Sequence, residues 1–134
     1  MLTIKPGEHG STYGRNPLAC HVATAAFQVL REENLAQNST ERGEQLRKGL
    51  RAMVGTTPIL EVRGRGLLNA IVIREENGSD MGKAWHICLT MKEHGLLAKP
   101  THGNIIRFAP PLTISEGEVD ECLGLIEKSL RQHC

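Results

Sequence analysis

The sequence predicts an α+β domain in which helices cover one face of a small, mostly antiparallel sheet. Hydrophobic periodicity gives the element order helix, helix, strand, strand, helix, strand, strand, helix. Strands that follow one another with helices on either side favour two packed layers. A chain of 134 residues is long enough for one such domain with a real core.

Composition is that of an ordinary globular domain, with 40% apolar and 23% charged residues. The net charge is only +1, so bulk charge predicts neither a nucleic-acid partner nor an anionic membrane. No apolar run has the length of a membrane span. The core is expected to be aliphatic, because the only aromatic residues are Tyr13, Phe27, Trp85 and Phe108.

Cysteines and histidines predict neither a disulfide framework nor a metal site. The cysteines lack paired spacing, and three of them fall on apolar faces of predicted helices, so we expect reduced thiols in a reducing compartment. They are Cys20, Cys88, Cys122 and Cys134. The histidines show no i, i+4 pair beside an acid, so no metal ligand is expected. They are His9, His21, His86, His94, His102 and His133.

The first half of the chain predicts a loop and two helices. Residues 1–16 are rich in turn formers. Asn16 is a good N-cap and Pro17 suits the first helical position. The apolar stripe of this helix is Leu18, Val22, Ala25, Ala26, Val29 and Leu30. A second helix is predicted from about Leu35 to Val54, with a thinner stripe (Leu46, Leu50, Met53) weakened by Gly43 and Gly49.

The second half predicts strands and two further helices. Strands are expected at 59–63 and 67–73, with Gly64 and Gly66 forming a tight turn or bulge between them. Asp80 is expected to cap a third helix with Ala84, Ile87, Cys88 and Met91 inward, ended by Gly95.

Short strands are expected at 96–98 and 105–108, the second stopped by Pro110-Pro111. Ser115 and Glu118 form a capping box for the last helix. Its apolar stripe is Val119, Cys122, Leu123, Ile126 and Leu130.

Two features are candidates for binding chemistry. The loop at 10–14, Gly-Ser-Thr-Tyr-Gly, precedes a helix and could turn backbone N–H groups and hydroxyls toward an anion. Arg107 lies within an apolar strand, where it either faces solvent or grips a carboxylate through two hydrogen bonds. Lys99 precedes Pro100 without neighbours that suit a catalytic lysine, so it is expected to be structural or solvent-facing.

Four separated segments, covering nearly the whole chain, resemble a known family. Residues 9–14, His-Gly-Ser-Thr-Tyr-Gly, followed by Asn-Pro-Leu at 16–18, are similar to the loop-to-helix signature of class III pyridoxal-phosphate-dependent aminotransferases. The segments 62–70, 95–103 and 105–112 are more selective and resemble the ornithine aminotransferases of that family. Their sequences are VRGRGLLNA, GLLAKPTHG and IIRFAPPL.

The resemblance implies a fold-type I enzyme that transfers the δ-amino group of ornithine to 2-oxoglutarate. Residues 1–34 would be the end of the large domain, with the cofactor-phosphate loop and its helix, and residues 35–134 the small C-terminal domain. Ser11 and Thr12 would contact the phosphate of pyridoxal 5'-phosphate in the neighbouring subunit of a homodimer. Arg107 would meet a substrate carboxylate or a glutamate of the large domain. The family also implies the mitochondrial matrix.

Two departures from the family pattern qualify this expectation. Arg15 replaces the second glycine of a Tyr-Gly-Gly-Asn-Pro motif. The catalytic lysine of the family lies upstream of the matched segment, so the resemblance implies a C-terminal fragment with no catalytic residue, inactive alone and not expected to hold the cofactor. The alternatives are a non-catalytic remnant that acts as a binding or dimerisation module, or part of a class III enzyme acting on acetylornithine or 4-aminobutyrate.

Overall fold

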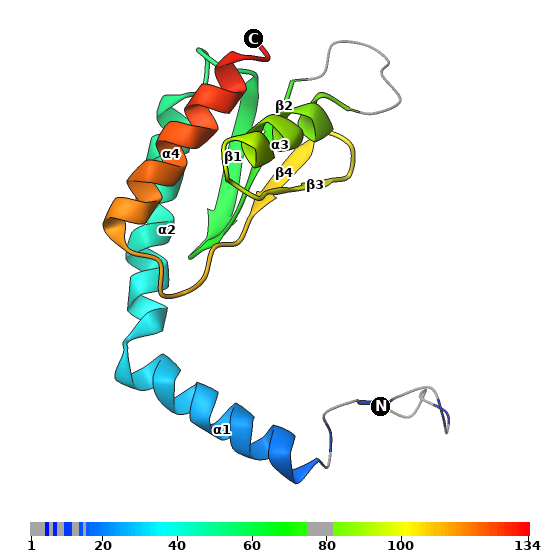
Figure 1. Cartoon of the computed structure of the whole chain (residues 1–134), viewed down its shortest axis with the longest axis vertical. Helices are drawn as coiled ribbons and strands as arrows, with labels where there is room; N and C mark the ends of the chain where they lie inside the picture. The colour runs from blue at the N-terminus through cyan, green and yellow to red at the C-terminus, as the bar shows by residue number, and fades with distance from the viewer. Residues whose placement is uncertain (1–4, 6, 8–9, 12–13, 15, 75–81) are drawn as a thin grey trace. The chain divides into compact units, whose positions relative to one another are not determined.

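The computed structural model describes residues 5, 7, 10–11, 14, 16–74 and 82–134 (Figure 1). The chain separates into two compact units, residues 1–35 and residues 36–134. The second unit holds the whole sheet and the hydrophobic core.

The first unit contains helix α1, Pro17–Glu32. Its predicted cap is confirmed, because the Asn16 side chain accepts hydrogen bonds from the N–H groups of Leu18 and Ala19. Asn34 ends the helical run with φ +51°. No residue of α1 is buried, so Cys20 and the apolar stripe lie exposed among the described residues.

The second unit is built on a four-stranded antiparallel sheet with strand order β1-β2-β4-β3. β1 is Ile59–Arg65 and β2 is Leu68–Ile73, joined by a two-residue turn that begins at Gly66, where φ is +53°. The predicted hairpin is confirmed, with the first strand two residues longer than expected. The register irregularity lies between Ile59 and Glu61, not at the glycines.

Helix α3, Lys83–Glu93, ends as predicted. The N–H of Gly95 donates to the carbonyl of Lys92, and the N–H of Leu96 donates to that of Met91. With φ of +89° at Gly95, this is a Schellman motif. At the other end the cap residue is Gly82 and makes no side-chain cap bond, so the prediction of a cap at Asp80 was wrong; Asp80 itself lies outside the described residues.

The strand predicted at residues 96–98 was also wrong, and the structure gives the reason. The N–H of Leu96 is used to close the C-terminus of α3, so the chain joins the sheet only afterwards, as β3, Lys99–Thr101. β3 pairs with β4, Ile105–Phe108, at the sheet edge. An edge strand tolerates Pro100, which has no N–H to donate.

Helices α2, Leu35–Ala52, and α4, Glu116–Arg131, pack with α3 on one face of the sheet, as predicted (Figure 1). The capping box of Ser115 and Glu118 starts α4. One aliphatic core joins the helices to alternate strand residues. It contains Leu46, Leu50, Met53, Ile59, Leu67, Ile71, Ile73, Ala84, Ile87, Cys88, Met91, Ile106, Phe108, Ile114, Val119, Ile126 and Leu130.

Helix α2 lies directly against the β1–β2 turn. A Cβ on Gly43 would stand 1.9 Å from the carbonyl oxygen of Gly66, so only glycine allows this approach. The buried Arg47 then donates from Nη1 to that same carbonyl and to Oδ1 of Asn69, both at 2.7 Å. Glu44 pairs with the other side of the guanidinium at 2.9 Å. The glycine that weakens the helix locally is therefore what lets it dock.

Two histidines join α3 to the last turns of the chain. His94 Nδ1 lies 2.9 Å from the hydroxyl of Ser129, and His133 Nε2 lies 2.8 Å from that of Thr90. Burial lowers the pKa of His133, and the charges of His86 and Lys83 lower it further. Protonation of His133 is therefore disfavoured in the folded state.

Replacing Gly43 with alanine should destabilise the chain although alanine is the better helix former. The added Cβ overlaps backbone that cannot move freely, and overpacking typically costs about 1–3 kcal/mol. The matched control is Gly124→Ala in α4, where nothing lies within 4 Å of the new Cβ and a gain of about 0.5–1 kcal/mol is expected. Denaturant unfolding measures both. Equal gains for the two variants would contradict the close approach.

Stability should fall as pH decreases from about 7.5 to 5.5. A histidine whose folded pKa is lowered contributes stability that is present above its unfolded pKa of about 6.5 and is lost as pH falls through that value toward the folded pKa. His133→Gln retains an N–H donor for Thr90 and should flatten this part of the profile. Thermal melts from about pH 5.5 to 7.5 test this prediction. If stability depends on pH as steeply in the variant as in the wild type, groups other than His133 cause the pH dependence.

Candidate functional site

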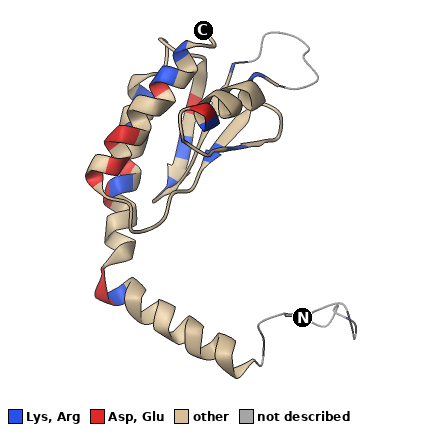
Figure 2. Cartoon of the chain, in the orientation of Figure 1, with Lys and Arg blue, Asp and Glu red and all other residues tan. Residues whose placement is uncertain are grey.

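The face of the sheet away from the helices carries a row of basic residues. The register aligns Arg63 of β1 with Ala70 of β2, Ala70 with Arg107 of β4, and Arg107 with Lys99 of β3. Directly paired residues of antiparallel strands lie on the same face. All three basic residues are exposed. Figure 2 shows the basic positions on the strands, while acidic residues gather mainly on the helices.

Arg107 has the geometry expected of an anion-binding side chain on a rigid element. Its strand neighbours Ile106 and Phe108 are buried in the core and fix the backbone, while Arg107 itself points away from it. Among the described residues no carboxylate lies within 4.0 Å of the Arg107 or Lys99 side chain. No carboxylate of the described residues therefore occupies the N–H donors of the Arg107 guanidinium.

Ser11 is the part of the predicted phosphate loop that the structure describes. Its hydroxyl oxygen accepts a hydrogen bond from the N–H of Gly14 at 2.9 Å. The oxygen orders the turn, and a serine hydroxyl also carries a donor hydrogen, which suits a phosphate oxygen. Thr12 and Arg15 lie outside the described residues. Ser11 belongs to the first unit and the basic row to the second.

The lysines in the described part of the chain do not have the environment of a catalytic lysine. A lysine that attacks a carbonyl must be desolvated, and none of the lysines there is buried. No group of three His, Cys, Asp or Glu side chains in residues 16–74 and 82–134 could hold a metal ion. No helix among the described residues is long and apolar enough to cross a membrane.

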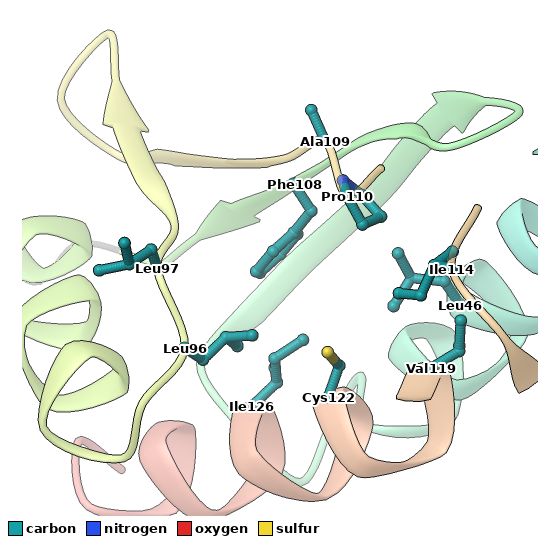
Figure 3. A pocket seen from close by; sticks show the side chains of 10 residues that line it. All are labelled: Leu46, Leu96, Leu97, Phe108, Ala109, Pro110, Ile114, Val119, Cys122 and Ile126. Carbon is teal, nitrogen blue, oxygen red and sulfur yellow. The ribbon is translucent and has the colours of Figure 1, made fainter. Parts of the chain in front are cut away.

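One hollow of the second unit is lined almost entirely by apolar side chains. It has a volume of about 90 Å³ and lies between α4, the segment after α3 and the end of β4. Figure 3 shows the Cys122 thiol facing it among aliphatic side chains and the ring of Phe108. Burial, Glu121 and Glu118 raise the pKa of Cys122, and burial raises that of Cys88 to about 11. Both shifts favour the neutral thiol over the thiolate.

Sequence reasoning placed Arg107 correctly in its strand but missed the neighbour that it meets. Lys99 was expected to be structural or solvent-facing, because it has no neighbours that suit a catalytic lysine, and it is exposed. The actual strand begins at Lys99 and pairs that residue with Arg107. The usable signal was the Gly95 cap, which keeps Leu96 out of the sheet.

The chain matches known aminotransferases along almost its whole length. The sequence model described as "Aminotransferase class-III" matches residues 1–130. The chain is 56% identical to "Ornithine aminotransferase, mitochondrial" of Rattus norvegicus over 130 residues, 97% of this chain and 29% of that protein. It is 52% identical to ornithine aminotransferase of Emericella nidulans over 133 residues, again 29% of that protein. The chain thus spans under a third of the length of these relatives.

Solved structures show the same fold. Acetylornithine aminotransferase from Elizabethkingia anophelis aligns with a TM-score of 0.83 and 50% identity, over 96% of this chain and 33% of that one. Ornithine δ-aminotransferase from Plasmodium falciparum aligns with a TM-score of 0.82 and 40% identity, over 99% of this chain and 34% of that one.

Reversing the charge of Lys99 should stabilise the second unit. Like charges on directly opposed strand residues are unfavourable, whereas an opposite pair contributes about 0.2–1 kcal/mol. The unfolding free energy should be highest for Lys99→Glu, intermediate for Lys99→Gln and lowest for the wild type. These differences should shrink as salt is added. Denaturant titrations at low and high salt provide the measurement. A wild type more stable than both variants would mean that Lys99 has a favourable partner.

Proposed function

The chain belongs to the class III aminotransferase family, and on that premise we propose that the protein containing it transfers the δ-amino group of ornithine to 2-oxoglutarate. The products are glutamate semialdehyde and glutamate. The observation that carries this proposal is the 50–56% identity to ornithine aminotransferases of animals and fungi over nearly all of these residues. The exposed Lys99 and Arg107, with no carboxylate within 4.0 Å among the described residues, support a carboxylate-binding role.

Within that protein, these residues supply binding groups and not the reacting lysine. Pyridoxal 5'-phosphate, when bound, supplies the electron sink that amino-group transfer needs. The hydroxyl of Ser11 suits its phosphate, with Thr12 beside it in the sequence, and we propose that both reach the cofactor of a neighbouring subunit. Arg107 orients a substrate carboxylate through the two-point geometry of its guanidinium.

The proposal also covers the domain division, the assembly and location of the full-length protein, and the properties of these 134 residues alone. Residues 1–34 belong to the large domain and residues 35–134 to the small one; the separation of compact units near residue 35 supports this division. We propose a homodimer or a higher homo-oligomer. We also propose the mitochondrial matrix as its location, and the word "mitochondrial" in the names of several relatives supports the organelle. We also propose that these 134 residues, which span 29% of the ornithine aminotransferase of Rattus norvegicus, neither transaminate nor bind the cofactor by themselves.

The direct test is an amino-donor comparison with the full-length protein. Ornithine, N-acetylornithine and 4-aminobutyrate are offered separately with 2-oxoglutarate, and glutamate formation is followed. Ornithine should give the highest kcat/KM. A preference for N-acetylornithine would move the protein to the activity named for the Elizabethkingia relative. Absence of transfer from all three donors would refute the proposal.

Replacing Arg107 with lysine in the full-length protein should lower kcat/KM about tenfold to a hundredfold in at least one half-reaction. Lysine keeps the charge but loses the two-point grip, and a charge-assisted hydrogen bond is worth about 1.5–3 kcal/mol. Single-turnover measurements separate the two half-reactions. The control is Arg131→Lys, an exposed residue of α4 paired with Glu127, which should leave both rates unchanged. Unchanged rates for Arg107→Lys would return this residue to a solvent-facing role.

A further inference from the structure

Lys99 and Arg107 form a cross-strand pair of like charge without a visible structural benefit. They are directly opposed between β3 and β4, and both are exposed. Among the described residues neither side chain has an acid within 4.0 Å. Directly opposed like charges cost free energy. An anion held between or above them would remove that cost.

The third cation of the row strengthens the same field. Arg63 lies two strands from Arg107, with Ala70 between them on the same face. Adjacent strands are about 4.8 Å apart, so all three charges act on one region above the sheet. Ala70 is the smallest side chain that a chiral residue can have and leaves room above the strand. Glu61, two residues before Arg63 in β1, lies on the same face, so the net positive charge is concentrated at the Lys99 and Arg107 end of the row.

The two substrates of the proposed reaction carry net charges of opposite sign. At neutral pH, 2-oxoglutarate carries two carboxylates and is a dianion, whereas ornithine carries two ammonium groups and one carboxylate and is a cation. In either substrate, Arg107 and its surroundings bind at most one carboxylate. A second cation beside Arg107 therefore attracts the acceptor and repels the distal ammonium of the donor.

We propose that Lys99 is a specificity-determining residue, whose charge beside Arg107 favours the dianionic acceptor over the cationic donor. This inference rests on the proposed function, because it concerns the two substrates of that reaction. It assigns to Lys99 a role through charge alone, so arginine replaces it and a neutral residue does not. Its mark is a pair of effects with opposite sign, which a purely structural role would not produce.

The test uses the full-length protein and the variants Lys99→Gln and Lys99→Arg. Lys99→Gln should raise KM for 2-oxoglutarate by up to about fivefold, the effect of one exposed charge pair, while KM for ornithine falls. Lys99→Arg should keep both wild-type values. Calorimetric titration with glutarate, an unreactive dicarboxylate, should show the same loss of affinity in Lys99→Gln, and the loss should shrink at high salt. Lys128→Gln, an exposed lysine of α4, is the matched control and should change neither constant.

The outcomes separate the inference from the proposed function. Wild-type protein that transfers no amino group from ornithine refutes the function itself. An active wild type, with KM for both substrates unchanged in Lys99→Gln, overturns only the role of Lys99. A parallel rise of both KM values in Lys99→Gln, together with a lower melting temperature, also overturns it, because that pattern is structural.

Discussion

The close contact between α2 and the β1–β2 turn holds the second unit in its arrangement. Gly43 lets the helix backbone reach the carbonyl of Gly66, and the buried Arg47 then ties that carbonyl to Asn69. A buried guanidinium is stable only when its donors are used, and here the carbonyl, the amide oxygen and Glu44 use them. This junction fixes the hairpin, and the hairpin fixes the strands that pair with it.

The functional consequence lies on the opposite side of the sheet. Because alternate residues of a strand point to opposite faces, burying Ile106 and Phe108 against the helices forces Arg107 outward. The antiparallel register then brings Lys99 beside it and Arg63 into the same row. A core packed from one side of the sheet thus leaves Arg107 and Lys99 exposed, with no carboxylate within 4.0 Å among the described residues. Such a face suits the carboxylates on which aminotransferases act.

Much of the fold could be predicted from local patterns. The Asn16 and Ser115 caps, the Gly95 terminus, the inner face of α3 and the β1–β2 hairpin all follow from residue types at fixed spacing. The strand at 96–98 was predicted wrongly because apolar composition does not reveal that Leu96 donates its N–H to the helix before it. Arg47 was not singled out, since a charged residue on a helix ordinarily faces solvent.

The sequence by itself determined the element types, the aliphatic core, the family resemblance and the strand position of Arg107. It did so because caps, hydrophobic periods and motifs are local properties of the chain. Only the tertiary structure decided that Gly43 is a docking position, that Arg47 is buried, and that Lys99 stands opposite Arg107. Each of these depends on strand register or on contact between segments far apart in sequence, and such contacts are set by global packing rather than by neighbouring residues.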